Sequence, residues 1–328
     1  MIRFGVVGTN WITERFLDGA KLEPRFQFAA VYSRTEERAQ EFADKYDVKT
    51  IFTDIHNMAE SDEIDAVYIA SPNSFHASQA IVFLEQGKHV LCEKPIASNA
   101  TELKRMRDAA RKHNVVLMEA MKPTLVPNFK VAKDNLPKIG KVRRYFASYC
   151  QYSSRYDAYK QGNILNAFKP EFSNGALMDI GIYCLYPLIV LFGKPDKVQA
   201  TGVMLDSGVD GEGSILLTYK DMDAVIMYSK ITNSELPCEI QGEEGNLIFD
   251  QMNVPEKVEI RYRNGSKEEL TQTQERQAMF YEVEEFINII QSGQQESTIN
   301  SIENSLMVLE IMDECRRQLG IIYPADQI

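Results

Sequence analysis

The first 120 residues alternate between short apolar runs and amphipathic segments, and this alternation limits the fold more than any other feature of the chain. Six apolar runs are typical of buried strands, and most are separated by segments with helical periodicity. The predicted strands are residues 2–7, 26–32, 50–52, 66–70, 89–92 and 115–118, and the predicted helices are residues 11–19, 35–46, 74–86 and 99–112. Because strands that alternate with helices form parallel sheets, we expect a doubly wound α/β sheet here.

The pattern changes after about residue 120, where strand-like segments follow one another with tight connections. These segments are residues 142–151, 198–205, 213–219, 224–231, 238–241, 247–249 and 258–262. They predict a large, mainly antiparallel sheet, interrupted by one long apolar helix over residues 175–192. Two further helices are predicted over residues 276–291 and 301–318. We therefore expect a first domain of residues 1–120 and an α+β domain of residues 121–328, whose C-terminal helix can pack back on the first domain.

Composition is that of an ordinary folded protein without a membrane segment. Apolar residues make up 44% of the 328 positions, which is enough for a core in each domain. The longest nearly apolar stretch, residues 185–192, is far short of the ~20 residues that span a bilayer. The N-terminus lacks the basic and apolar regions of a secretory signal. These features predict a cytoplasmic protein.

Charge and cysteine usage exclude several classes of partner. The formal charge is -11, and residues 235–328 carry most of the acidic excess. An acidic chain without a basic stripe is poorly suited to nucleic acid, since affinity there depends on Lys and Arg contacts to phosphate. Five cysteines, none in a CxxC pair, favour reduced thiols over disulfides and exclude a zinc dehydrogenase site by their spacing. We expect a small-molecule ligand and no metal.

The first predicted strand ends in a turn that can bind phosphate. Gly8, Asn10 and Thr13 align with the glycines of a G-x-G-x-x-G dinucleotide motif, although only Gly8 is a glycine. We expect Gly8 to make the tight turn, Asn10 to accept a positive φ, and the next helix to offer N–H groups to a pyrophosphate. The predicted cofactor residues here are Gly8, Thr9, Asn10, Trp11 and Ile12. The alternative is an ordinary strand-to-helix turn.

The end of the second strand indicates which dinucleotide would bind. An NAD-selective site usually presents an acid to the ribose hydroxyls at this point, but the chain has Ser33 and Arg34. Ser33 can hydrogen-bond, Arg34 can pair with a 2′-phosphate, and Arg38 lies one helical turn later on the same face. We therefore expect NADP as the preferred cofactor, with NAD also accepted. In the alternative, the neighbouring acids Glu36 and Glu37 pair with these arginines at the surface.

Polar residues also follow the fourth and fifth predicted strands, at the sheet edge where ligands collect in open α/β folds. The candidate cofactor residues after these strands are Ser71, Pro72, Asn73, His76, Glu93 and Lys94. For the first group there is a structural alternative, because Asn73 or Ser74 can cap the following helix and His76 can satisfy a local hydrogen bond. After the fifth strand, Glu93, Lys94 and Pro95 place an acid, a base and a rigid proline next to one another.

These segments resemble one known family. Gly-Lys-His-Val-Leu-Cys-Glu-Lys-Pro at residues 87–95, with Ser-Pro-Asn-x-x-His at residues 71–76, is similar to the Gfo/Idh/MocA oxidoreductases, of which Glu-Lys-Pro is the hallmark. Residues 118–121 and 175–183 carry the resemblance into the rest of the chain. It implies a Rossmann domain, a C-terminal domain with an open sheet often used for dimerisation, and hydride transfer between NAD(P) and a sugar, polyol or similar alcohol. A homodimer or higher oligomer is therefore expected.

Three residues are the predicted catalytic group. Asp179 and Tyr183 are spaced i, i+4 on the predicted helix, so they share one face, which in this fold would look towards Lys94. A carbinol loses its hydroxyl proton as hydride leaves, and we assign the acceptor role to Tyr183 with Lys94 favouring its phenolate. The tyrosine resembles a branch that includes glucose-fructose oxidoreductase and dimeric dihydrodiol and xylose dehydrogenases, whereas many members carry histidine. Asp179 would orient the substrate or Lys94, or is simply a buried helix residue.

The chain departs from that branch where Trp and Arg are common, since it has Lys122 and Thr124 there. This departure predicts an altered substrate pocket in which Lys122 binds a carboxylate or a hydroxyl, or points to solvent. Arg155 and Asn166 are further candidates for substrate binding. Some relatives are transcriptional regulators that keep the dinucleotide fold, so a binding protein without turnover is the alternative function. Retention of both Lys94 and Tyr183 argues for the enzyme.

Overall fold

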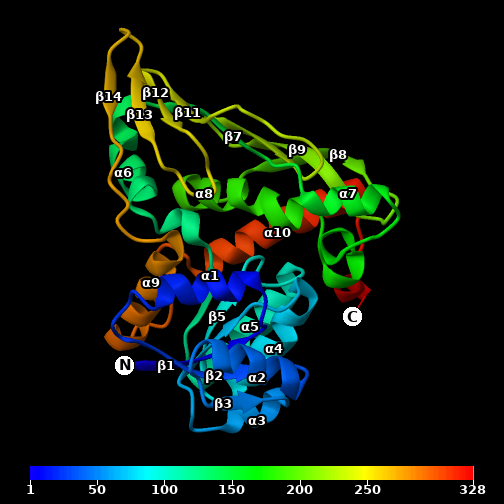
Figure 1. Cartoon of the computed structure of the whole chain (residues 1–328). Coiled ribbons are helices and arrows are strands. Elements are labelled where there is room, and N and C mark those ends of the chain that lie inside the picture. The colour runs from blue at the N-terminus through cyan, green and yellow to red at the C-terminus, as the bar shows by residue number, and fades with distance from the viewer. Residues whose placement is uncertain (328) are drawn as a thin grey trace. The chain divides into compact units, whose positions relative to one another are not determined.

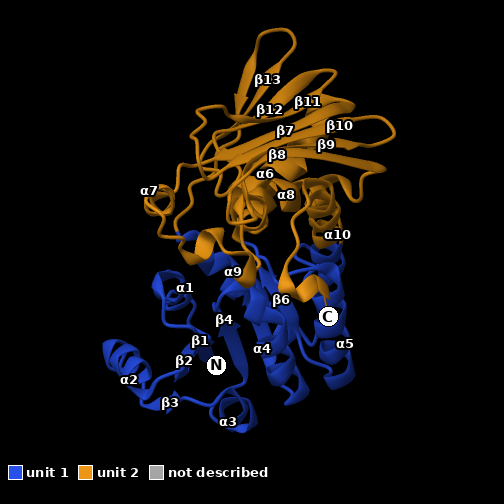
Figure 2. Cartoon of the chain, turned by 90° about the vertical axis from the view of Figure 1, so that its right-hand side faces the viewer, with its two compact units in different colours: residues 1–121, 276–306 blue, residues 122–275, 307–328 orange. Residues whose placement is uncertain are grey.

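A computed structural model describes residues 1–327, which form two compact units. The first contains residues 1–121 and 276–306, and the second contains residues 122–275 and 307–328, as Figure 2 shows by colour. The chain thus leaves the first unit, builds most of the second and returns. This path differs from the two continuous segments expected above, because residues 276–306 pack with the N-terminal sheet.

The first unit is built on a parallel sheet of six strands in the order β3-β2-β1-β4-β5-β6. Its strands are β1 (Ile2–Val7), β2 (Phe26–Tyr32), β3 (Thr50–Phe52), β4 (Ala66–Ile69), β5 (His89–Glu93) and β6 (Leu117–Ala120). Its helices are α1 (Trp11–Ala20), α2 (Glu36–Lys45), α3 (Ile55–Glu60), α4 (Asn73–Glu85), α5 (Ala100–His113) and α9 (Ala278–Ser292). The predicted doubly wound sheet is confirmed. Its strand order reverses between β1 and β4, the place where ligands bind in such sheets.

Aromatic packing explains why α9 returns to this unit. The ring centre of Phe286 on α9 lies 5.8 Å from that of Phe4 on β1, and both side chains are buried. The helix also approaches α1 closely at Gly19, where a Cβ would lie 2.9 Å from the backbone nitrogen of Phe280. Each buried aromatic ring removes a large apolar area from water, so these contacts stabilise the docking of α9.

The second unit contains an eight-stranded sheet in the order β14-β13-β12-β11-β7-β10-β9-β8, in which only β7 and β10 pair in parallel. Its strands are β7 (Val142–Cys150), β8 (Lys197–Met204), β9 (Asp210–Thr218), β10 (Asp223–Ser229), β11 (Cys238–Gly242), β12 (Gly245–Phe249), β13 (Val258–Tyr262) and β14 (Lys267–Glu269). The helices are α6 (Pro127–Asn135), α7 (Ser154–Lys160) and α8 (Ile182–Phe192), while α10 (Ile302–Leu319) begins in the first unit. Figure 1 shows α8 running along one face of the sheet.

The long apolar helix of this unit is less regular than predicted. A π-helical turn, Leu177–Gly181, precedes α8, so Asp179 lies in the π-helical turn and Tyr183 in the α-helix. Pro170–Phe192 is long and apolar enough to cross a membrane, which the stretch 185–192 alone is not. However, 72% of its apolar window is buried inside the protein, as in the core helix of a soluble domain. The hydroxyl of Tyr145 on β7 donates to the carbonyl of Cys184 at 2.9 Å and ties this helix to the sheet.

Four short elements have no counterpart among the predicted ones, namely α3, α6, α7 and β14. Strand β6 also begins two residues later than predicted. Short elements carry few periodic positions, so their apolar pattern is weak, and tertiary contacts decide where they form.

Candidate functional site

The turn between β1 and α1 is held against the end of β4. Gly8 has φ +105°, and a Cβ on it would lie 2.8 Å from the carbonyl oxygen of Ala70. The amide nitrogen Nδ2 of Asn10 donates to that same oxygen at 2.7 Å. The side chain of Asn10 also caps α1 by accepting from the backbone N–H of Ile12 at 2.9 Å. The expected positive φ at Asn10 is wrong: its φ is -100°, because an N-cap residue takes an extended conformation.

We expect Gly8→Ala to destabilise the first unit and to abolish cofactor binding. The added methyl group meets the backbone of Ala70, and alanine at φ +105° is itself strained, so the combined cost is about 2–4 kcal/mol. Gly87→Ala is the matched control, since Gly87 also has a positive φ of +72° but no atom within 4 Å of its Cβ position. Thermal unfolding should show a larger loss for Gly8→Ala. Equal losses would contradict the role of the close approach.

Arg38 connects α2 to the same turn. Its guanidinium donates to the backbone oxygen of Thr9 at 2.8 Å and to its hydroxyl at 3.2 Å. It also pairs with Glu41 at 2.6 Å, and within residues 1–327 neither Glu36 nor Glu37, the acids expected to compete for it, forms an ion pair with it. Arg34 is exposed at the end of β2. The segment after β2 therefore carries two guanidinium groups, Arg34 in the loop and Arg38 on α2, and Arg38 also binds the turn after β1.

His76 joins the loops that follow β4 and β5. It is buried, with Nε2 2.8 Å from the carbonyl oxygen of Ser71 and Nδ1 2.9 Å from that of Pro95. Burial lowers the pKa of His76. Asn73 is the first residue of α4, whose N-cap is Pro72 without a side-chain cap bond, so the proposed capping by Asn73 or Ser74 is wrong. The bond to Ser71 is the local hydrogen bond foreseen as its alternative role, and the bond to Pro95 ties this loop to the one after β5.

Two buried carboxyl groups lie beneath these loops. The hydroxyl of Tyr68 donates to Oε1 of Glu93 at 2.5 Å, and the backbone N–H of Lys94 donates to Oε2 at 3.1 Å. On β6, Oε1 of Glu119 accepts from the backbone N–H of Ile96 at 3.0 Å. Burial, assisted by the charge of Glu93, raises the pKa of Glu119 to about 7. Glu93 and Glu119 thus fix the backbone on both sides of Lys94 and Pro95.

This raised pKa makes stability depend on pH. Between about pH 4.5 and pH 7, folded Glu119 still holds a proton that the unfolded chain has released. Its contribution to the free energy of unfolding is therefore fully present below about pH 4.5 and is lost as the pH rises towards 7. The loss amounts to up to about 3 kcal/mol. Glu119→Gln keeps the acceptor for Ile96 but cannot ionise, so we expect its unfolding temperature to fall less between pH 5 and pH 8 than that of wild type. Glu60→Gln, at an exposed position, is the control, and identical pH profiles for all three proteins would contradict the assignment.

In the second unit, Asp179 has a partner that the sequence did not reveal. Asp179 pairs with Nζ of Lys230, which immediately follows β10. The Lys230 side chain is 5% exposed, and its ammonium lies 5.5 Å from the centre of the Phe168 ring. Asp179 is more accessible, at 31%. A buried ammonium beside a partly exposed carboxylate gives a charged, hydrogen-bonding group at this position.

Tyr183, four residues beyond Asp179, contacts two other polar side chains of the same unit. The ring of Tyr149 on β7 meets it edge-on with centres 5.7 Å apart. The ammonium of Lys122 lies 5.8 Å from the centre of the Tyr183 ring, within cation–π range. Lys122 therefore does not simply point to solvent.

Among the predicted catalytic and substrate residues, Lys122 and Tyr183 are in contact. Lys122, Asp179 and Tyr183 lie in the second unit with the contacts given above, whereas Arg155 on α7 and Asn166 are exposed. The backbone N–H of Arg155 donates to the hydroxyl of Ser153, and the carbonyl of Asn166 accepts from the backbone N–H of Lys169. Lys230 and Tyr149 were missed because neither belongs to a short motif. For Lys230, the sequence offers one weak signal, which is the position of a lysine directly after the apolar strand β10.

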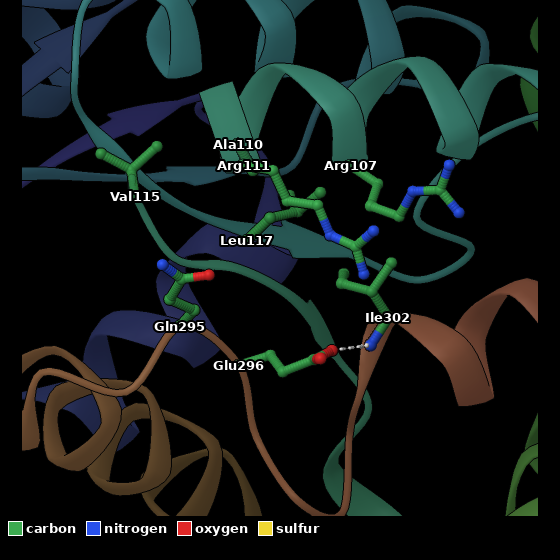
Figure 3. Close-up of a pocket in the computed structure, with 8 residues that line it drawn as sticks. All are labelled: Arg107, Ala110, Arg111, Val115, Leu117, Gln295, Glu296 and Ile302. Atoms are coloured by element: carbon green, nitrogen blue, oxygen red, sulfur yellow. Dashed lines mark hydrogen bonds between the residues drawn. The ribbon is translucent and has the colours of Figure 1, made fainter. Parts of the chain in front are cut away.

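The cavity drawn in Figure 3 is not part of this site. It lies between α5 and the segment before α10, and its volume is about 30 Å³, room for about one water. Glu296 faces its rim and accepts from the backbone N–H of Ile302 at 3.0 Å. Arg107 and Arg111 of α5 line it. The cavity is too small for a dinucleotide or a sugar.

Comparison with known proteins identifies the class. Residues 2–121 match the family described as "Oxidoreductase family, NAD-binding Rossmann fold", and residues 137–248 match the "GFO/IDH/MocA C-terminal domain". The chain therefore belongs to the GFO/IDH/MocA family, as its motifs indicated, and it is an NAD(P)-dependent oxidoreductase.

Particular relatives are similar over their whole length. Scyllo-inositol 2-dehydrogenase (NADP(+)) IolU of Bacillus subtilis is 57% identical and covers 100% of both chains. Trans-1,2-dihydrobenzene-1,2-diol dehydrogenase of Danio rerio is 31% identical and covers 99% of both. Among solved structures, the 3-ketoreductase KijD10 of Actinomadura kijaniata, in complex with NADP and TDP-benzene, superposes with a TM-score of 0.83 at 26% identity, covering 97% of each chain.

Proposed function

We propose that this protein is an NADP-preferring dehydrogenase that oxidises one hydroxyl of a cyclic polyol of the inositol type, or reduces the corresponding ketone. The observation that supports this proposal most strongly is the 57% identity, over the full length of both chains, to an enzyme named for scyllo-inositol and NADP. The shorter motifs agree with it, since Lys94, Asp179 and Tyr183 occupy the positions that the family resemblance assigns to the reaction.

The residues of the first unit fit the cofactor. The N-terminus of α1 provides N–H groups and a favourable helix dipole for a pyrophosphate. Arg34 and Arg38 provide guanidinium groups for a 2′-phosphate, with Ser33 between them and the sheet. Bound here, the cofactor supplies the acceptor or donor of the hydride. Acidic residues that would repel a 2′-phosphate are absent from the end of β2 within residues 32–35.

The chain's own side chains would handle the proton. We assign Tyr183 to accept the proton of the reacting hydroxyl, Lys94 and Lys122 to favour its phenolate, and Asp179 to orient the substrate. Lys94 and Tyr183 belong to different units, so their joint action is proposed from the family motif and from the chemistry that each group can perform. The Lys122 contact with the Tyr183 ring supports the part played by the second unit.

A substrate panel tests the proposal. The purified protein is mixed with NADP⁺ and, in separate reactions, scyllo-inositol, myo-inositol, a cyclic diol and an open-chain polyol, while NADPH absorbance is followed. We expect the highest kcat/KM for an inositol. Preference for an open-chain polyol would contradict the ring specificity, and a protein that binds NADPH but turns over none of these alcohols would favour the dinucleotide-binding regulator.

We further propose that the enzyme is a cytoplasmic homodimer or higher oligomer formed through the uncovered face of the eight-stranded sheet. Register places Leu216, Val225 and Phe146 side by side on three neighbouring strands, and Leu216 is 42% exposed. A row of this kind exposes apolar area that self-association would bury. The five free cysteines agree with a reducing compartment. A single species of monomer mass in sedimentation at micromolar concentration would contradict the oligomer.

A further inference from the structure

Lys230 is fixed in place by its main chain as well as by its side chain. Its backbone N–H donates to the carbonyl of Gly211 at 2.9 Å, and its own carbonyl accepts from the N–H of Ser153 at 2.9 Å. The side chain then runs to Asp179 past the Phe168 ring. Two segments distant in sequence therefore hold the main chain of Lys230, and Phe168 and Asp179 lie at its ammonium.

Stability alone does not explain why Lys230 is buried beside Asp179. Removing an ammonium from water carries a large desolvation penalty, and a buried ion pair is often no more stabilising than an apolar pair of the same size. The pair keeps Asp179 ionised, and an ionised carboxylate is purely an acceptor with about four lone-pair sites. The Lys230 ammonium binds at one of these sites, and the side chain of Asp179 is 31% exposed, so a ligand can reach it. A hydroxyl is a ligand that needs such an acceptor.

The proposed function defines which hydroxyl this is. Asp179 lies one helical turn before Tyr183, to which we assign the proton of the reacting hydroxyl. Resting on that function, we propose that Lys230 is a positioning residue that holds Asp179 as an ionised acceptor for the hydroxyl next to the reacting carbon. The site thereby selects rings with neighbouring hydroxyls over simple alcohols.

Calorimetry and kinetics together test this role. The dissociation constant of scyllo-inositol is measured for the NADPH complex of wild type, Lys230→Met, Lys230→Arg and Lys220→Met. Lys220 is an exposed lysine of the turn between β9 and β10 and serves as the matched control. We expect Lys230→Met to weaken inositol binding by about 10- to 100-fold, the strength of a hydrogen bond to a charged group. In turnover, KM should rise by the same factor with kcat changed less than about threefold. Lys230→Arg should recover most of the loss.

A second comparison separates this role from a merely structural one. The ratio of kcat/KM for cyclohexane-1,2-diol to that for cyclohexanol should fall about tenfold or more in Lys230→Met and stay unchanged in Lys220→Met. If Lys230→Met fails to fold, Asp179→Asn is used, and a ratio equal to that of wild type would overturn the inference. Equal inositol affinity in wild type and Lys230→Met would overturn it too, with the proposed function intact.

A wild type that binds inositol without turning it over would refute the proposed function, and the binding series would then still decide the role of Lys230. No inositol binding would refute both.

Discussion

Tyr183→Phe is expected to lower kcat for inositol oxidation by about 100- to 10,000-fold, the range that a positioned acid or base contributes. The substitution removes only the hydroxyl, so the edge-on contact with Tyr149 and the Lys122 ammonium near the ring can persist. We therefore expect the affinity for NADPH to change less than about threefold. Steady-state kinetics with saturating NADP⁺, together with a cofactor titration, would check both statements.

Tyr262→Phe is the matched control, because it removes a tyrosine hydroxyl of the same unit that donates to Glu268 at 2.6 Å, outside the proposed site. It should leave kcat unchanged. Lys94→Met should lower kcat as Tyr183→Phe does, and the double variant should lose little more, since residues that act as a unit are not additive. A Tyr183→Phe enzyme with normal kcat would mean that another group takes the proton.

Arg34→Ala is expected to weaken NADPH binding by about tenfold or more, at least ~1.4 kcal/mol, while leaving NADH binding unchanged. Arg38→Ala should weaken both cofactors, because Arg38 also holds the backbone and hydroxyl of Thr9. Trp11 is the only tryptophan and is 57% exposed at the start of α1, so its fluorescence can report the arrival of either cofactor. Titrations corrected for inner-filter absorption would give the dissociation constants.

The comparison with Arg105→Ala, at an exposed position of α5, controls for the loss of a surface charge. Wild type should bind NADPH at least about tenfold more tightly than NADH. Tighter binding of NADH would contradict the roles of Ser33, Arg34 and Arg38 but would leave the oxidoreductase intact. Equal effects of Arg34→Ala on both cofactors would show that Arg34 does not contact the 2′-phosphate.

The parallel sheet and the family could be predicted because their signals are local. The periodicity of a buried strand followed by an amphipathic helix is visible within about 15 residues. Glu93, Lys94 and Pro95 are adjacent in the sequence, so their motif can be identified without knowledge of the fold. The same local signals gave a wrong prediction at Asn10, whose residue type suits two different backbone conformations. Asn10 tolerates a positive φ, but its side chain is also a good helix cap, and the extended conformation of a cap is the one adopted.

Local pattern was thus sufficient for the doubly wound parallel sheet, the turn at Gly8 and the assignment of Lys94, Asp179 and Tyr183 as candidates. Packing alone decided that α9 returns to the first unit, that His76 joins two loops and that Lys230 meets Asp179 across 51 positions of the chain. The physical reason is that periodicity reports which face of one element is buried, but it does not report the partner. The partner depends on shape, charge and desolvation summed over elements that are far apart in sequence.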